Sequence, residues 1–201
     1  MGGILPIFKS HYSLGRSILT LGKPNQSLDE GSDSIFDICQ EGEIKDLYLV
    51  DDNMAGFLEA YSNAEELDIK LVFGLRLTFC LNVSNKSEEG RRNSYKNIIF
   101  ATNTEGYKRL IKIYTFAAQE GFYYEPRMDF DNLKQFWSDD LLLVAPFYDS
   151  FLYSNKYSDS KCVPDFSYAT PTFFLEDNDT LLDKDMNKSV ESFCKDKYDT
   201  V

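Results

Sequence analysis

The pattern of apolar and polar positions from Leu47 to Phe79 predicts a strand, a helix and a second strand. The apolar run Leu47–Val50 ends in two carboxylates. It is followed by apolar residues at i, i+3, i+4 and i+7, the spacing that places side chains on one helix face: Met54, Phe57, Leu58 and Tyr61. Asn53 precedes them at the position of an N-cap. The apolar run Ile69–Phe73 then predicts a strand, so a β-α-β unit is expected.

Similar patterns predict further elements on both sides of this unit. Strands are expected at Ile4–Phe8, Asn97–Ala101, Leu141–Ala145 and Phe173–Leu175, with another beginning at Tyr198–Val201. Helices are expected after Ser32, after Asn103, from Asp129 or Asp131 to Trp137, and over Leu181–Lys195. Residues 82–95 are polar and rich in turn formers, which predicts an exposed loop, and residues 147–164 are expected to be irregular. Alternating strands and helices indicate an α/β fold with a mainly parallel sheet.

Two of these helices have apolar positions that predict a buried face. In the helix after Asn103 they are Tyr107, Leu110, Ile111 and Tyr114. In the helix over Leu181–Lys195 they are Leu182, Met186, Val190 and Phe193.

The composition narrows the class of protein. The length of 201 residues is that of a single domain, taken as 1–201, with ample core. An aromatic content of 15 % favours a packed globule over disorder. The net charge of −12 argues against direct binding of DNA phosphates, because such binding needs clustered Lys and Arg. Membership of a DNA-handling complex, in which another chain holds the DNA, stays open.

The cysteines and the N-terminus indicate a cytosolic protein. The four cysteines are widely spaced and form no CxxC pair, so we expect reduced thiols, with Cys39 and Cys80 buried. The N-terminus lacks a basic region followed by an apolar run, and therefore predicts no signal peptide. No stretch reaches the roughly 18–20 apolar residues that a membrane span requires.

Three charged residues lie where a parallel sheet places its ligands. Asp51 and Asp52 follow the first strand of the β-α-β unit, and Arg76 follows the apolar run of the second. Residues just past the ends of parallel strands converge on one rim of the sheet, where ligands bind. Asp51, Asp52 and Arg76 are therefore candidate site residues.

Several segments in a fixed order resemble one known family. They are YSL near the N-terminus, LVDDNMAGFLEAY, IKLVFGLRL, FATNTEGYKRLIKI, EGFYYEPRMD and TFFLED. Together they are similar to the PHP (polymerase and histidinol phosphatase) domain, in the version that opens the alpha subunit of bacterial C-family replicative polymerases, DNA polymerase III. The similarity runs from Ile4 to Val201. Its most specific pieces are Asn103–Ile113 and Gly121–Arg127.

This resemblance implies a fold and a range of functions. The expected fold is a distorted (β/α)7 barrel, with a mainly parallel sheet, flanking helices and a metal cluster at one rim held by His and acidic residues. Active members hydrolyse phosphoesters and proofread DNA ends. In some polymerases the site has decayed, and the domain serves as a scaffold and dock for a separate proofreading exonuclease. The chain stops before the family's last strand, so we expect the barrel to lack its last unit.

The chain departs from the family at almost every metal ligand. The ligand positions fall on or near Ile7, Lys9, Arg16, Asp52, Arg76, Lys96 and Phe147, with Asp51 beside them. The single histidine, His11, aligns with none of them. Multinuclear sites need several imidazoles and carboxylates, whereas four of these positions carry cationic side chains that repel a dication. We therefore expect no metal, no cofactor and no catalytic residue.

Two interpretations of the cationic positions remain open. In the first, Asp51 and Asp52 pair with the cations and replace the bracing once given by metals. In the second, the cations form an anion pocket for a phosphate or a nucleotide end. Base stacking on the aromatic run Phe122–Tyr124 is a further alternative, set against ordinary packing.

The expected function is that of a non-catalytic module of DNA replication. The chain would be a fragment of an alpha subunit, or a stand-alone relative such as a viral protein that imitates it. Its expected partners are replisome proteins, such as a proofreading exonuclease or the polymerase core, in the cytoplasm of a bacterial cell. Direct DNA binding is expected to be weak or absent. The alternatives are a metal-dependent phosphoesterase or 3'-5' exonuclease with an altered site, and an anion- or nucleotide-binding module.

Overall fold

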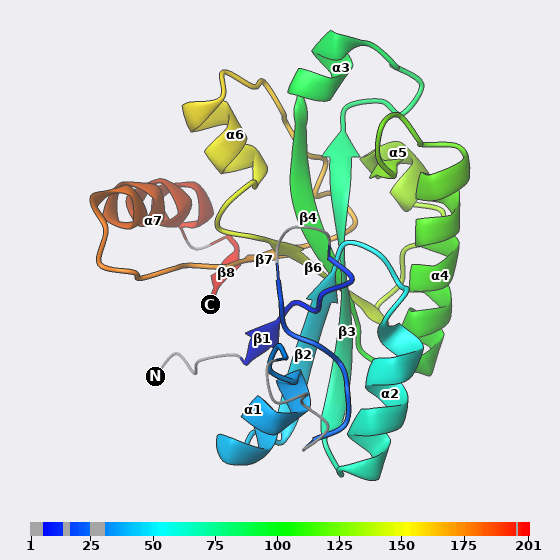
Figure 1. Cartoon of the computed structure of the whole chain (residues 1–201). Coiled ribbons are helices and arrows are strands. Elements are labelled where there is room, and N and C mark those ends of the chain that lie inside the picture. Colours follow the sequence, from blue (N-terminus) through cyan, green and yellow to red (C-terminus); the bar gives the residue numbers. More distant parts are fainter. Residues whose placement is uncertain (1–5, 14–16, 25–30, 196) are drawn as a thin grey trace. The chain divides into compact units, whose positions relative to one another are not determined.

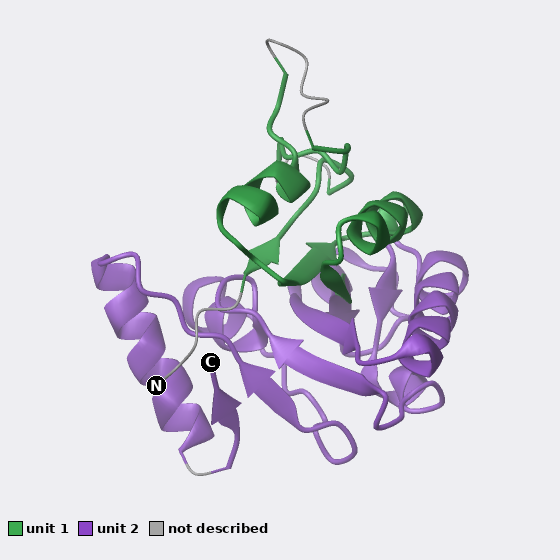
Figure 2. Cartoon of the chain, turned by 90° about the horizontal axis from the view of Figure 1, so that it is seen from below, with its two compact units in different colours: residues 1, 3–76 green, residues 2, 77–201 purple. Residues whose placement is uncertain are grey.

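The computed structural model describes residues 6–13, 17–24, 31–195 and 197–201. The chain divides into two compact units, coloured separately in Figure 2. The first ends at Arg76 and the second begins at Leu77, so the boundary falls within one long strand. Each unit is described by itself below.

The first unit contains the β-α-β arrangement predicted from the apolar pattern. Its elements are β1 (Ile7–Phe8), α1 (Ile35–Glu41), β2 (Asp46–Asp51), α2 (Phe57–Glu66) and the first part of β3 (Lys70–Cys80) (Figure 1). β2 is parallel to both β1 and β3, and Asp51 at its end lies opposite Leu75. The strand predicted over Ile69–Phe73 is confirmed, and β3 continues beyond it to Cys80.

The predicted face of α2 was right for Phe57, which is buried, and wrong for Leu58 and Tyr61. The helix begins at Phe57 after Gly56, and Asn53 instead accepts a hydrogen bond from the amide of Ala55 at 2.9 Å in the preceding turn. Leu58 and Tyr61 are 74 % and 51 % exposed, whereas the buried face carries mostly small residues: Phe57, Ala60, Asn63 and Ala64. Apolar spacing cannot distinguish two such faces when the buried one is lined by alanine.

The first helix starts two residues later than predicted. Ser34, and not Ser32, is its N-cap, and its side chain accepts a hydrogen bond from the amide of Phe36. Gly42 is its C-cap.

The second unit continues β3 and adds the remaining elements. These are α3 (Glu88–Arg92), β4 (Ser94–Ala101), α4 (Thr104–Gln119), β5 (Arg127–Met128), α5 (Phe130–Leu133), β6 (Leu141–Ala145), α6 (Phe151–Tyr157), β7 (Pro171–Phe173), α7 (Leu181–Cys194) and β8 (Asp199–Thr200). The end of β3 is parallel to β5, β6 is parallel to β7, and β7 is parallel to β8, whereas β4 and β6 are antiparallel. The α/β fold with a mainly parallel sheet and flanking helices is confirmed.

Two segments expected to lack regular structure each contain a short helix. Residues 82–95 include α3, capped by Ser87, and the first residues of β4. Residues 147–164 include α6, capped by Ser150. Both serines cap their helices by accepting a hydrogen bond from a backbone amide. Because the two segments are rich in polar residues, these capping serines could not be told apart from ordinary loop serines in the sequence.

Helices α4 and α7 lie close to their predicted positions. The side chain of Asn103 caps α4 by accepting a hydrogen bond from the amide of Gly106, as predicted. Leu110 is buried, but Ile111 is 44 % exposed and Ile113 takes its place in the core. In α7, Met186 and Val190 point inward as predicted, while two residues of the predicted face are substantially exposed: Leu182 and Phe193.

All four cysteines are free and buried, in agreement with the prediction of reduced thiols. Burial is the main cause that raises the pKa of Cys39, Cys80 and Cys194, each to about 11. These side chains therefore act as small core residues. Among the described residues, no helix is long and apolar enough to span a membrane.

We expect Gly106→Ala to destabilise the protein, although glycine to alanine inside a helix normally adds about 1 kcal/mol of stability. An added Cβ would lie 2.2 Å from the carbonyl oxygen of Asp140, and backbone cannot easily move away. The free energy of unfolding should fall by about 1–3 kcal/mol, as overpacking usually does. Urea unfolding measures it. Lys112→Ala, at an exposed position of the same helix, is the control, and a gain for Gly106→Ala would contradict the packing described.

Candidate functional site

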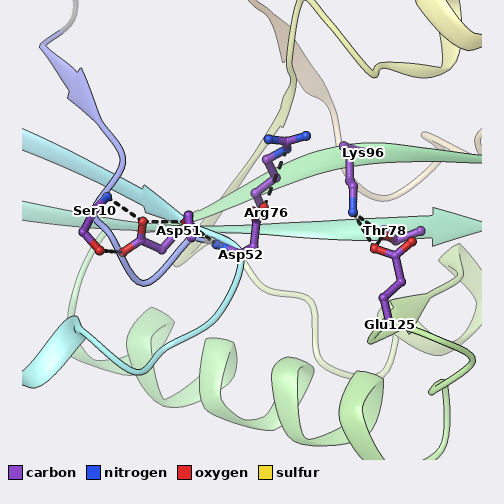
Figure 3. A network of polar contacts seen from close by, with 8 residues as sticks. Ser10, Asp51, Asp52, Arg76, Thr78, Lys96 and Glu125 are labelled. Atoms are coloured by element: carbon purple, nitrogen blue, oxygen red, sulfur yellow. Dashed lines mark hydrogen bonds and ion pairs between the residues drawn. The ribbon is translucent and has the colours of Figure 1, made fainter. Parts of the chain in front are cut away.

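The first unit holds a fully buried carboxylate at the end of β2. Asp51 Oδ1 accepts hydrogen bonds from the amide of Ser10 at 2.8 Å and from the hydroxyl of Ser13 at 2.7 Å. Its Oδ2 accepts a third from the hydroxyl of Ser10 at 2.6 Å, and Figure 3 shows both bonds from Ser10. Asp51 therefore fixes the segment that follows β1 against the end of β2.

The same serines organise the chain around this carboxylate. The hydroxyl of Ser13 also accepts a hydrogen bond from the amide of Asp52 at 3.1 Å, and the hydroxyl of Ser10 accepts one from the amide of Tyr12 at 3.2 Å. The first of the two interpretations pairs Asp51 with cations, but the hydrogen bonds that Asp51 accepts come from hydroxyl and amide groups. Three of the roughly four acceptor positions of a carboxylate are thus occupied by the protein itself.

Asp52 points to a different partner. Its Oδ1 lies 3.8 Å from Nε of Arg76, whose side chain is only 5 % exposed. Figure 3 shows the Arg76 side chain beside Asp52. The two adjacent carboxylates thus have separate roles, as expected where neighbouring residues of an extended segment face opposite sides.

Tyr12 lies in the same N-terminal segment and donates a hydrogen bond to Glu59 at 3.1 Å. This bond is the largest of the effects that raise the pKa of the Tyr12 hydroxyl, followed by the negative charge of Glu59. Tyr12 therefore remains a neutral donor at physiological pH.

The second unit holds a lysine in a mixed polar cluster. Nζ of Lys96 lies 2.7 Å from Oε2 of Glu125 and donates a hydrogen bond to the hydroxyl of Thr78. The Thr78 hydroxyl in turn donates to the same carboxylate oxygen at 2.6 Å, so the three groups form a closed triangle (Figure 3). The side chain of Lys96 is 18 % exposed and that of Glu125 is 45 % exposed, so the ion pair is shielded from solvent on its lysine side only.

Sequence reasoning identified Lys96 but missed Thr78 and Glu125. Glu125 lies in the family-like motif Gly121–Arg127, and Thr78 stands two residues after Arg76. Neither residue corresponds to a metal ligand, and only the tertiary structure brings them to Lys96. The motif itself was the one signal that pointed to Glu125.

The other candidate positions have ordinary surroundings or lie outside the description. Ile7 belongs to β1 and lies opposite Tyr48, Lys9 is half-buried, and Phe147 is a core residue packed edge-on against Tyr148. Arg16 lies outside the described residues. His11 is exposed, with its ring 4.3 Å from that of Tyr12.

The residues present at these positions do not fit a metal cluster of the kind the family uses. In the part of the chain that the structure describes, no group of three or more His, Cys, Asp or Glu side chains is placed to hold a metal ion. Two of the positions that the resemblance assigns to ligands carry an ammonium group engaged with Glu125 and a guanidinium beside Asp52. A positively charged side chain at such a position repels a metal dication.

We expect Asp51→Asn to lower the free energy of unfolding by about 2–3 kcal/mol, because the new amide group would face hydrogen-bond donors with its own donors. Asp46→Asn, at the other end of the same strand, is the matched control. Its side chain is 53 % exposed and its partner Lys70 is 73 % exposed, so a change within about 1 kcal/mol is expected. Denaturant unfolding followed by circular dichroism measures both. Equal, small effects would show that the serine contacts of Asp51 do not brace the unit.

Comparison with known proteins gives the family. Residues 24–159 match the sequence model of the PHP domain. The chain is 28 % identical over 145 residues to the DNA polymerase III subunit alpha of Borreliella burgdorferi, which covers 67 % of this chain and 13 % of that protein. It is 32 % identical over 83 residues to the subunit of Helicobacter pylori strain 26695, covering 41 % and 7 % of the two chains. For Aquifex aeolicus the identity is 29 % over 100 residues, covering 46 % and 9 %.

The chain thus corresponds to a small part, 13 % or less, of these three curated relatives. The family match covers more than half of the chain and runs through both compact units. It includes the β-α-β unit, Asp51, Arg76, Lys96 and the Gly121–Arg127 motif. The chain belongs to the PHP domain family.

Proposed function

We propose that the two units together form one non-catalytic PHP-like module of DNA replication. The module acts as a structural scaffold and a protein-docking surface, either within a DNA polymerase III alpha subunit or as a stand-alone relative that imitates one. The similarity to alpha subunits supports the replication setting. The observation that carries the non-catalytic role is the engagement of Lys96, at a former ligand position, with Thr78 and Glu125.

The physical argument rests on what the charged groups already do. Lys96 is committed to an ion pair, and Asp51 is committed to three donors. Releasing Asp51 to a metal would leave the hydroxyls of buried Ser10 and Ser13 without their acceptor, which costs about 1–3 kcal/mol for each group. The ammonium group of Lys96 has no lone pair to offer a metal. These residues therefore favour bracing of the fold over metal-assisted hydrolysis.

The proposed partners are replisome proteins in a bacterial cytoplasm, first of all a proofreading exonuclease or the polymerase core. The net charge of −12 supports protein contacts over direct contact with DNA, because DNA phosphates repel an acidic surface. A viral protein acting inside a bacterial cell would meet the same partners.

We expect the purified chain to contain sub-stoichiometric metal and to leave p-nitrophenyl phosphate intact with added Mn²⁺ or Zn²⁺. Elemental mass spectrometry and release of nitrophenolate measure the two quantities. In the same preparation, gel filtration is run with a purified proofreading exonuclease and, separately, with the polymerase core, and at least one of them should co-elute with the chain. Stoichiometric tightly bound metal with phosphoester turnover would overturn the non-catalytic role, and separate elution from both proposed partners would overturn the docking role.

The variant Arg76→Glu separates bracing from anion binding. Arg76 is buried near Asp52, so a second carboxylate there should unfold the first unit or lower the melting temperature by several degrees. Thermal unfolding is measured with and without inorganic phosphate. Lys70→Glu, an exposed change in the same strand, is the control. An unaltered melting temperature together with loss of stabilisation by phosphate would favour the anion pocket instead.

A further inference from the structure

A cleft of about 480 Å³ opens in the first unit, where α1 and α2 end; we call it the helix-end cleft. It is lined by residues from the last turns of the two helices and from the segments that lead into β2 and β3: Cys39, Gln40, Glu43, Ile44, Lys45, Leu67 and Ile69. β2 and β3 are parallel neighbours and both begin beside the cleft, whereas Asp51 lies at the opposite end of β2 (Figure 1). The volume falls in the range of roughly 300–1,000 Å³ that small-molecule sites occupy.

A tight turn fixes one side of the helix-end cleft. Glu43 follows the C-cap of α1 and has φ of 53°, the left-handed conformation in which helices commonly end. The amide of Ile44 donates a hydrogen bond to the carbonyl of Cys39 at 2.8 Å and closes the turn. The amide of Lys70 donates to the carbonyl of Lys45 at 2.8 Å and ties the turn to β3. This part of the cleft is therefore formed in advance, so that binding requires little further ordering of the backbone.

The inner part of the helix-end cleft carries no charge. Ile69 is 7 % exposed, and the side chains of Ile44 and Leu67 are half-buried. Cys39 is buried beside them, and burial raises the pKa of its thiol to about 11, so the thiol is neutral at physiological pH. Such a lining suits a hydrocarbon group, because a charged group placed there would lose its hydration without gaining an ion pair.

The exposed part of the helix-end cleft carries one charge of each sign, on Glu43 and Lys45. In the part of the chain that the structure describes, neither side chain forms an ion pair or a hydrogen bond. The two residues are two positions apart, so their Cα atoms lie within about 7 Å of each other. A ligand with a single charge would be attracted by one side chain and repelled by the other. A ligand with both charges close together is complementary to the pair.

We propose that the helix-end cleft binds a free α-amino acid with an apolar side chain, such as leucine. Glu43 accepts hydrogen bonds from the ammonium group and Lys45 donates to the carboxylate, while the hydrocarbon side chain lies against the uncharged inner part of the cleft. The two charged groups of an amino acid are attached to one carbon atom, whereas those of a peptide lie at its two ends, so the free amino acid fits the short spacing better. The cleft shares no residue with the groups that brace the fold, and this inference goes beyond the docking role.

The test titrates the whole isotope-labelled chain with leucine and follows its amide signals by NMR, which also shows whether the fold is kept. Saturable shifts are expected at the residues that line the cleft, with Kd in the millimolar range because both charges are exposed. Glycine lacks the side chain and should bind about ten-fold more weakly or worse. Leucinamide lacks the carboxylate and isocaproate lacks the ammonium group, and each should bind about three-fold more weakly than leucine.

Two variants assign the charges. Glu43→Gln and Lys45→Gln each leave the apolar lining in place and should weaken leucine about three-fold. Glu43→Gln should also remove the preference for leucine over isocaproate, and Lys45→Gln the preference over leucinamide. Glu41→Gln, at an exposed carboxylate of α1 that does not line the cleft, is the matched control and should leave the affinity unchanged.

Three results would overturn the amino acid site. The first is the absence of saturable shifts up to about 50 mM leucine, well above the expected range. The second is equal affinity for leucine in the wild-type chain and both charge variants. The third is binding of leucinamide or isocaproate as tight as that of leucine, which would show a site for a single charge. None of these results bears on the docking role, which co-elution tests without any amino acid present.

Discussion

A carboxylate without water around it must be satisfied by donors from the protein, and Asp51 shows how strongly this requirement shapes the first unit. Its three hydrogen bonds come from the segment after β1, forty residues away in sequence, and hold that segment to the end of β2. The β2–β3 pairing then places Arg76 on the neighbouring strand, close to Asp52. A polar requirement at one residue therefore sets the path of the chain around it.

The second unit contains a partly shielded cation, Lys96, whose charge is balanced by an ion pair instead of by neutral donors. Lys96 lies on strand β4, and the chain supplies Glu125 and Thr78 to accommodate it. The pair is partly exposed, with Lys96 at 18 % and Glu125 at 45 %, so its value lies in holding Glu125 in place more than in the strength of the charge attraction. The cluster also anchors the turn that carries Tyr124, so a site suited to bracing also positions an exposed aromatic surface.

The sequence predicted the order of most elements because apolar runs and caps are local signals. The Asn103 cap and the strand over Leu141–Ala145 were found in place. The predicted face of α2 was wrong at Leu58 and Tyr61 because the buried face carries Ala60 and Ala64, and small residues do not stand out in a pattern of large apolar side chains. The partners Thr78 and Glu125 could not be found from spacing, since they meet Lys96 only through the fold. The sequence likewise did not identify Ser10 and Ser13 as hydrogen-bond donors to Asp51, because serine is common in turns of any kind.

The buried thiols have a practical consequence for the chain. A thiol reacts with maleimides as its thiolate, and burial both shields the four cysteines and raises their pKa. A single cysteine introduced at an exposed position in each unit would therefore react far faster than the native ones. Spectroscopic labels attached in this way would report the distance between the two units, and its change when a partner binds, without removal of any native cysteine.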